Sequence, residues 1–196
     1  MKLNAPARIL AVAAVCAAAL IGLVINEGAA RGAGVEVRLA MAAIDPRALL
    51  SGHYVIIDMR EQLAPDQTCP AREDAWDWIA LRPTEDGHHT LAGAAPSRER
   101  AQLIGPVPVK GSFTCSPGAA SEDPEQPGFP GWVGVDIGID RFHINQTDAQ
   151  RIERVLREQR ADEATRAYAI VSVGRDGRAR LKGLEIDGER LELSWL

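Results

Sequence analysis

The sequence predicts an α+β fold, mostly antiparallel β, with a single extracytoplasmic domain behind one N-terminal transmembrane helix. An uncharged apolar run near the amino terminus predicts the helix. The remaining chain carries most of the 18 glycines and 12 prolines, which punctuate turns and weaken helix interiors. Short segments with period-two alternation lie between these turns. With 196 residues, of which 46% are hydrophobic, the chain is long enough for one well-buried domain.

The apolar run extends from Ile9 to Ile25. A helix of this length reaches roughly 25 Å, which with its flanks is enough to span a bilayer core. Lys2 and Arg8 precede it, so the amino terminus is expected to stay in the cytoplasm. We therefore predict a cytoplasmic segment at 1–8, a transmembrane anchor or uncleaved signal in contact with membrane lipid at 9–26, and a periplasmic β-rich domain at 33–196. The chain would be a single-pass protein of the bacterial inner membrane, with its amino terminus inside.

Gly28-Ala29-Ala30 is a small-residue sequence of the kind that precedes signal cleavage. Cleavage after Ala30 would release a soluble periplasmic ligand binder, and this remains an alternative. The apolar run is longer than the about 7–15 residues of an ordinary signal core, which favours the anchor.

Two cysteines, Cys69 and Cys115, lie outside the apolar run that contains Cys16. The periplasm permits disulfides, so we predict a bridge between them. The alternative is a pair of unrelated buried thiols. The formal net charge of −5, with scattered cations, gives no field that would gather phosphates. Nucleic acid is therefore not expected as a partner.

In the first half of the domain, residues 35–41 alternate as a half-buried strand. Asp45 then offers an N-cap and Pro46 the first position of a short helical turn that ends at Gly52. Residues 53–59 follow as a strand, whose more apolar face should meet the core: His53, Val55, Ile57 and Met59.

Weaker signals predict a strand at 76–80, a turn at 85–87 and a returning strand at 88–92. An edge strand is expected at 107–113, because its prolines cannot donate to a ladder on both sides. The proline-rich segment 116–131 reads as a surface loop.

The carboxyl half predicts a strand, a helix and then a meander. The strand covers 132–144. The helix begins at Thr147, which forms a capping-box pattern with Gln150. Asp-Gly turns then separate three strands, at 168–173, 179–186 and 191–195.

The segment from Asp45 to Met59 resembles the signature of the GDYXXLXY family, named for its Gly-Asp-Tyr-x-x-Leu-x-Tyr motif. Gly52 and Tyr54 match, whereas His53, Ile57 and Met59 replace the acid, the leucine and the second tyrosine. The likeness extends over most of residues 35–186. It implies an extracytoplasmic β-rich domain on one membrane anchor, in a family commonly encoded with, or fused to, multi-spanning membrane proteins. It implies no reaction.

An enzyme is the competing hypothesis. Pro46, Leu49 and Gly52 also resemble the nucleophile segment of signal peptidases, in which a serine stands three residues before the proline. Ala43 occupies that position here, and Lys110 and Lys182 lie in unrelated contexts, so the Ser-Lys dyad cannot be carried over. Ser51 and His53 do not replace it, because residues i and i+2 of a strand stand about 6.5–7 Å apart.

Two further clusters have simpler explanations than binding sites. His88 and His89 beside Glu85 and Asp86 contain metal-ligating types, but neighbours in a strand point to opposite faces, and a solvated hairpin is favoured. Trp76 and Trp78 share a strand face, for which core or rim packing is the commoner use. The sequence therefore predicts no catalytic residues, metal or cofactor. It predicts a non-catalytic accessory or interaction module for a multi-spanning integral membrane protein.

Overall fold

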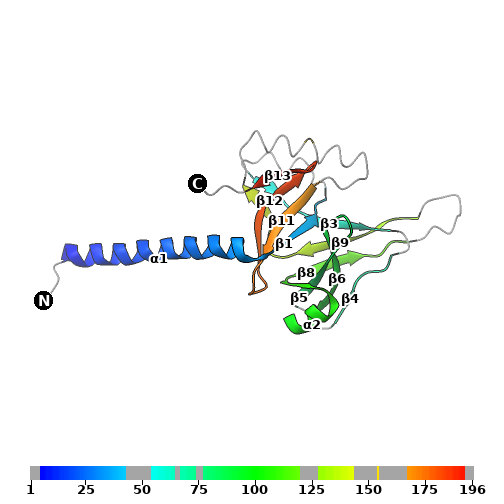
Figure 1. The fold of residues 1–196 in the computed structure, drawn as a ribbon, viewed down its shortest axis with the longest axis horizontal. Helices are drawn as coiled ribbons and strands as arrows, with labels where there is room; N and C mark the ends of the chain where they lie inside the picture. Colours follow the sequence, from blue (N-terminus) through cyan, green and yellow to red (C-terminus); the bar gives the residue numbers. More distant parts are fainter. Residues whose placement is uncertain are drawn as a thin grey trace.

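The computed structural model describes residues 5–42, 54–64, 67–73, 77–119, 128–143, 154 and 167–192. It confirms the predicted fold class: a long N-terminal apolar helix is followed by a mostly antiparallel β domain (Figure 1). The helix α1 (Ala5–Ala33) projects from one side of the domain and continues seven residues past the predicted span. Its last turns and strand β1 are separated only by Gly34, whose backbone lies against β11.

The described strands fall into three sheets. Their bounds, with the second helix, are β1 (Val35–Ala40), β2 (Tyr54–Ile56), β3 (Met59–Leu63), β4 (Ala71–Arg72), β5 (Trp78–Pro83), β6 (His89–Ala95), α2 (Arg98–Ile104), β7 (Val107–Lys110), β8 (Ser112–Ser116), β9 (Gly131–Asp136), β10 (Arg141–His143), β11 (Ala167–Val173), β12 (Ala179–Ile186) and β13 (Glu189–Glu192).

The largest sheet has eight strands in the order β13-β12-β11-β1-β6-β5-β7, with β4 paired to β6 off this path. Strand β1 lies at its centre. It pairs antiparallel with β11, where Val35 faces Val173, and parallel with β6, where Leu39 faces His89. The first strand thus joins the carboxyl-terminal meander to the β5–β6–β7 part of the chain.

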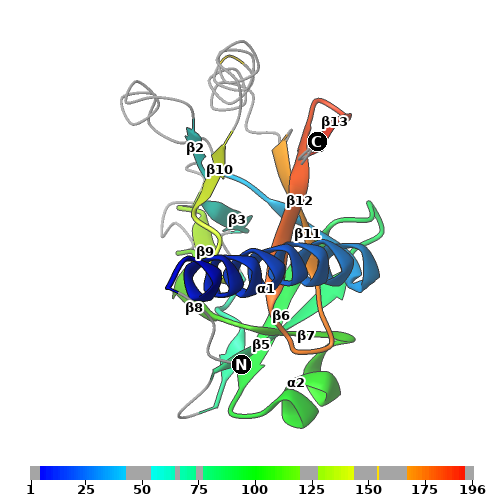
Figure 2. The same ribbon diagram turned by 90° about the vertical axis from the view of Figure 1, so that its left-hand side faces the viewer.

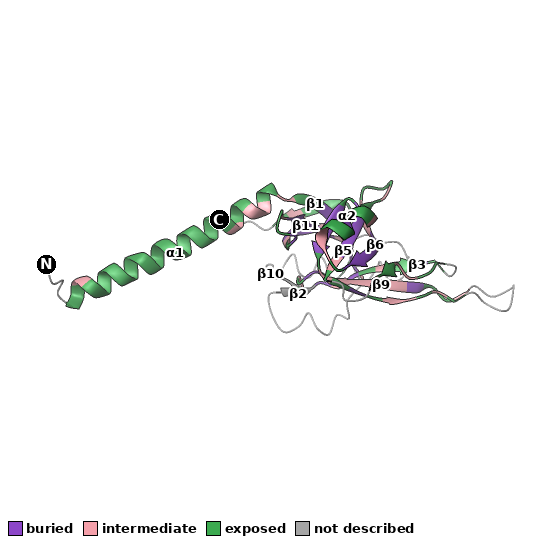
Figure 3. Ribbon diagram, turned by 90° about the horizontal axis from the view of Figure 1, so that it is seen from below, coloured by how far each residue is buried: buried purple, intermediate pink, exposed green. Residues whose placement is uncertain are grey.

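The other two sheets are β3-β9-β8 and β10-β2. The three-stranded sheet stands beside the larger one (Figure 2), and their facing side chains form the main hydrophobic core. Buried residues concentrate in the strands, whereas α1 is exposed along nearly its whole length (Figure 3). At the centre of the main core lie side chains such as Met41, Ile79, Leu81 and Leu184, none more than 1% exposed.

Local sequence signals were most accurate for β1 and for the meander β11–β12–β13. Strand β1 begins at Val35, as predicted. The Asp176-Gly177 turn joins β11 to β12, with Gly177 at φ +75°. The Asp187-Gly188 turn has both residues at positive φ, the conformation of a two-residue hairpin loop. Strand β13 begins at 189 rather than 191 and ends at Glu192 within the described residues.

Three predicted strands are each divided in two. The 53–59 and 132–144 segments pair with each other, and both break at the same level, near Ile57 and Gly138. Gly138 has φ +75° and its N–H donates to Asp136 Oδ1 (3.0 Å), while the Ile57 N–H donates to the Asp140 carbonyl (2.9 Å). The 107–113 strand breaks at Gly111, where the backbone passes too close to Asp136 and Ile137 for a side chain. There the chain leaves the large sheet for the small one.

Helix α2 was not predicted. Ser97 caps its start, accepting from the Arg100 N–H at 3.3 Å, and Ala101 is fully buried against β5 and β6. Several expectations lie outside the described residues: the helical turn at 45–52, most of the 147–159 helix and the centre of the 116–131 loop. At the described ends of that loop, Ala119 and Phe129 exchange both backbone hydrogen bonds.

Candidate functional site

The motif segment enters the described structure at Tyr54. Strand β2 pairs with β10, placing Tyr54 opposite His143 and Ile56 opposite Arg141. Ile57, 5% exposed, and Met59, 3% exposed, belong to the main core, as predicted from the apolar face. Asp45, Pro46, Gly52 and His53 lie outside the described residues, as do Ala43 and Ser51. Their proposed roles stay predictions.

His88 and His89 contact Thr84 of their own hairpin and residues of strands β11 and β1. The His88 ring lies 3.0 Å from the Thr84 hydroxyl through Nδ1 and packs on Tyr168, with centroids 5.7 Å apart. His89 Nδ1 faces the backbone N–H of Arg38 at 3.4 Å. Burial, the nearby His88 and Arg38 lower the pKa of His89. In the described part of the chain, no group of three His, Cys, Asp or Glu side chains is arranged to hold a metal.

Of the predicted tryptophan pair, Trp76 lies outside the described residues. Trp78 is half-buried and packs against the β11–β12 turn, where a Cβ on Gly177 would overlap its ring. The Lys110 ammonium stands over the same ring, 5.5 Å from its centroid. Trp78 therefore joins β5 to the hairpin, which is a packing role.

Cys69 and Cys115 form the predicted disulfide, with Cα atoms 5.9 Å apart. Cys115 lies in β8, and the bridge ties residues 67–70, which have no regular structure, to the small sheet. Closing a loop of 46 positions is worth about 3–4 kcal/mol in the unfolded-chain entropy model. Cys16 is free and exposed in α1.

An ionisable group that sequence reasoning missed is Glu61, in the middle of β3. It shares a strand face with buried Met59 and Leu63 and lies opposite buried Val133. Burial raises the pKa of Glu61 to about 7. A small cavity of about 10 Å³, room for one water molecule, lies between the two sheets and is lined by Glu61 and His89 among others. Extending the alternation of Val55, Ile57 and Met59 by one more member, to Glu61, would have placed this carboxyl on the apolar face.

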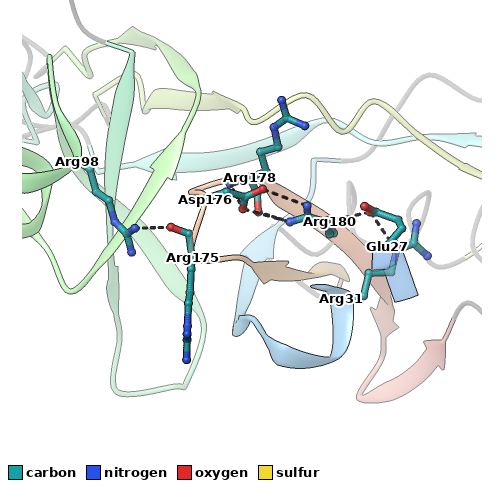
Figure 4. A network of polar contacts seen from close by, with 7 residues as sticks. All are labelled: Glu27, Arg31, Arg98, Arg175, Asp176, Arg178 and Arg180. Carbon is teal, nitrogen blue, oxygen red and sulfur yellow. Dashed lines mark hydrogen bonds and ion pairs between the residues drawn. The ribbon is translucent and has the colours of Figure 1, made fainter. Parts of the chain in front are cut away.

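A second missed feature lies where α1 enters the domain (Figure 4). Arg180 Nε donates to Glu27 Oε1 at 2.9 Å, and Arg180 Nη2 to Asp176 Oδ2 at 3.1 Å. The hydrogen bond from Arg180 lowers the pKa of Asp176. Arg31 stands 4.0 Å from Glu27, and Arg98 Nη1 donates to the Arg175 carbonyl. These contacts join α1, α2 and the β11–β12 hairpin.

A third polar cluster centres on Glu36. Lys182 Nζ contacts it at 2.6 Å and Arg190 at 2.8 and 3.0 Å, and these bonds lower the pKa of Glu36 to about 2. The cluster joins β1 to β12 and β13 on an open sheet face. Glu192 Oε1 lies 2.8 Å from Arg190 Nε, so two carboxylates balance the two cations and the cluster holds the three strands together.

Residues 16–184 match the family described as GDYXXLXY protein. The chain belongs to this family. No curated protein matches the chain, and no solved structure does. The matched range contains the carboxyl half of α1, β1–β11 and most of β12.

In this GDYXXLXY protein, the described part of the family motif, from Tyr54 to Met59, spans the break between β2 and β3. Tyr54 begins β2, Ile57 takes the leucine position in the core, and Met59 takes the second tyrosine position and forms a bridge with Met41 at the end of β1. Through Ile57 in the shared core and the Met41–Met59 bridge, the described part of the motif joins β2 and β3 to the large sheet. This is a structural role.

Proposed function

We propose that this GDYXXLXY protein is a non-catalytic accessory module, held in the bacterial inner membrane by α1 with its β domain in the periplasm, and that it binds a multi-spanning integral membrane protein. The observation that carries the proposal is α1 itself. None of its residues is buried, and its large apolar side chains are exposed, for example Ile9 at 71% and Leu23 at 68%. An apolar helix that buries none of its described residues against the domain needs lipid or another apolar helix around it.

Charge and redox chemistry support the orientation. Lys2 and Arg8 precede the apolar run, which favours an amino terminus in the cytoplasm. The Cys69–Cys115 disulfide is typical of an oxidising compartment such as the periplasm. The association with multi-spanning membrane proteins that the family resemblance implies supports the choice of partner.

The alternatives have less support. For a signal-peptidase-like hydrolase, Ala43 offers no nucleophile, Lys110 stands over the Trp78 ring and Lys182 is bonded to Glu36. For a soluble ligand binder cleaved after Ala30, the cut would fall within α1 and remove Glu27, the residue that α1 contributes to the bond with Arg180. The uncleaved anchor retains this contact.

Photo-crosslinking in native membranes tests the proposal. A photoreactive residue at Leu10 or Ile21 of α1 is compared with one at Leu103, an 88% exposed position of α2 that serves as the control. We expect a discrete adduct from an α1 position, identified by mass spectrometry as an integral membrane protein, and none from Leu103. Recovery of lipid adducts alone would contradict a protein partner, and extraction of the chain by alkaline carbonate would contradict the anchor.

A further inference from the structure

The chain is acidic as a whole, yet positive charge gathers where α1 meets the β domain. The group in Figure 4 contains five arginines and two carboxylates, an excess of three positive charges in a chain of net charge −5. Glu99 follows Arg98 in α2, and the Lys110 N–H donates to the Gly177 carbonyl, so one further charge of each sign adjoins this group. We define the arginine patch by four of these residues, namely Arg31 of α1, Arg98 of α2, and Arg175 and Arg178 on either side of the β11–β12 turn.

Neither carboxylate of the group pairs with Arg175 or Arg178. Glu27 and Asp176 are both bonded to Arg180, which is half-buried between them. Arg175 and Arg178 are exposed, and within the described part of the chain no ion pair engages either guanidinium. Two guanidinium groups, which point to opposite sides of the turn in Figure 4, therefore remain open to solvent.

The position of the turn relative to α1 fixes its depth. The apolar run ends at Ile25, and Glu27 is two residues, about 3 Å, farther along the helix. Arg180 links Glu27 to Asp176, so the turn is held close to this level. The headgroup layer extends about 5–8 Å beyond the hydrocarbon core on each side. Arg175 and Arg178 consequently stand at headgroup depth when α1 spans the membrane.

There is also space for a ligand. A cleft of about 520 Å³ opens between α1 and the hairpin, lined by Asn26, Ala30 and Ala33 on one side and by Gly174, Arg175 and Asp176 on the other. Its size falls within the range of small-ligand sites. Guanidinium groups bind phosphate through two parallel hydrogen bonds, which gives geometry as well as charge.

We propose that the arginine patch binds the phosphate headgroups of anionic phospholipids in the membrane that α1 spans. This inference rests on the proposed membrane anchor. The bound lipids fix the height of the β domain above the bilayer and the rotation of α1, because the hairpin and helix are already joined through Arg180. Each arginine near an anionic surface contributes roughly a fivefold increase in affinity, so Arg175 and Arg178 together contribute about twentyfold or more.

Native mass spectrometry of the full chain, released from micelles titrated with phosphatidylglycerol or phosphatidylcholine, tests the proposal. We expect wild type to bind phosphatidylglycerol about twentyfold more tightly, and Arg175→Gln/Arg178→Gln to lose this preference. The matched control is Arg72→Gln/Arg82→Gln, which removes two exposed cations. Arg72 lies four strand spacings from the turn, about 19 Å, through β6, β5 and β7. The control should keep the preference.

Equal binding of the two lipids by wild type would overturn the proposal, and this measurement does not depend on any variant folding. A preference that survives in the double variant would also overturn it. Flotation of wild type with phosphatidylcholine vesicles distinguishes a failure of the arginine patch from a failure of the membrane anchor. If the chain does not float with the vesicles, the proposed anchor, and with it the proposed function, is wrong. If it floats without a headgroup preference, only the arginine patch fails.

Discussion

Replacing Glu61 with glutamine is expected to stabilise the protein at alkaline pH and not at acidic pH. Burial raises the pKa of Glu61 from 4.5 to about 7. Between these values the folded chain retains a proton that the unfolded chain has released, so the free energy of unfolding falls as pH rises. Below pH 4.5 Glu61 is protonated in both states and costs the folded state no stability. Above pH 7 the loss of unfolding free energy caused by its ionisation is complete.

The size of the penalty follows from the pKa difference. A shift from 4.5 to about 7 corresponds to an upper limit of roughly 3 kcal/mol. Glu61 is only partly buried, so solvent screening reduces this to about 1–2 kcal/mol. Glutamine keeps the shape and removes the ionisation. The variant should therefore be about 1–2 kcal/mol more stable than wild type at pH 8, relative to their difference at pH 4.5.

Urea unfolding of both chains at pH 4.5, 6 and 8, under oxidising conditions, measures this difference. The lowered pKa of His89 acts in the opposite direction, since stability is lost as pH falls below 6.5, but it is common to both chains and cancels in the comparison. Glu36, with a pKa of about 2, does not titrate in this window when folded and is likewise shared. A difference between the two chains that stays constant with pH would refute the reasoning.

Two further predictions concern covalent and backbone constraints. The Cys69→Ser/Cys115→Ser variant should lose about 3–4 kcal/mol of unfolding free energy, measured in urea. Reductant should destabilise wild type by the same amount and leave the variant unchanged. A wild-type urea midpoint that does not change with reductant would argue against a stabilising bridge. Gly177→Ala should lose about 1–3 kcal/mol more than Gly188→Ala in the same assay, because both turns have positive φ but only the Gly177 methyl would meet Trp78, and equal losses would mean that this contact contributes nothing.

The success of sequence reasoning followed the range of the interactions involved. Alternation in residues 35–41 and two Asp-Gly turns are local signals, and β1 and the β11–β12–β13 meander appeared where they indicated. The disulfide followed from compartment and cysteine count. The divided strands were missed because their breaks depend on a partner: Ile57 bonds to Asp140, and Gly111 approaches Asp136. Such contacts join residues distant in sequence.

The candidate sites show the same division. The family motif was located from its residues, and Ile57 took the buried place that its strand face predicted. Glu61 was missed because the predicted strand ended at Met59, two residues before it, and only the larger sheet packing over β3 reveals its burial. The arginine patch was missed because its members are scattered from residue 31 to residue 178.

By itself, the sequence determined the membrane-length apolar helix, the class of the fold, the cysteine pair and the family, since each depends on composition, local periodicity or a short motif. Only the tertiary structure decided which sheet each half-strand joins, that β1 pairs in parallel with β6, and that Arg180 links α1 to the β11–β12 hairpin. These arrangements arise from packing and charge pairing between segments far apart in the chain, for which no local pattern exists. The acidic chain thereby places an excess of positive charge beside the apolar helix α1.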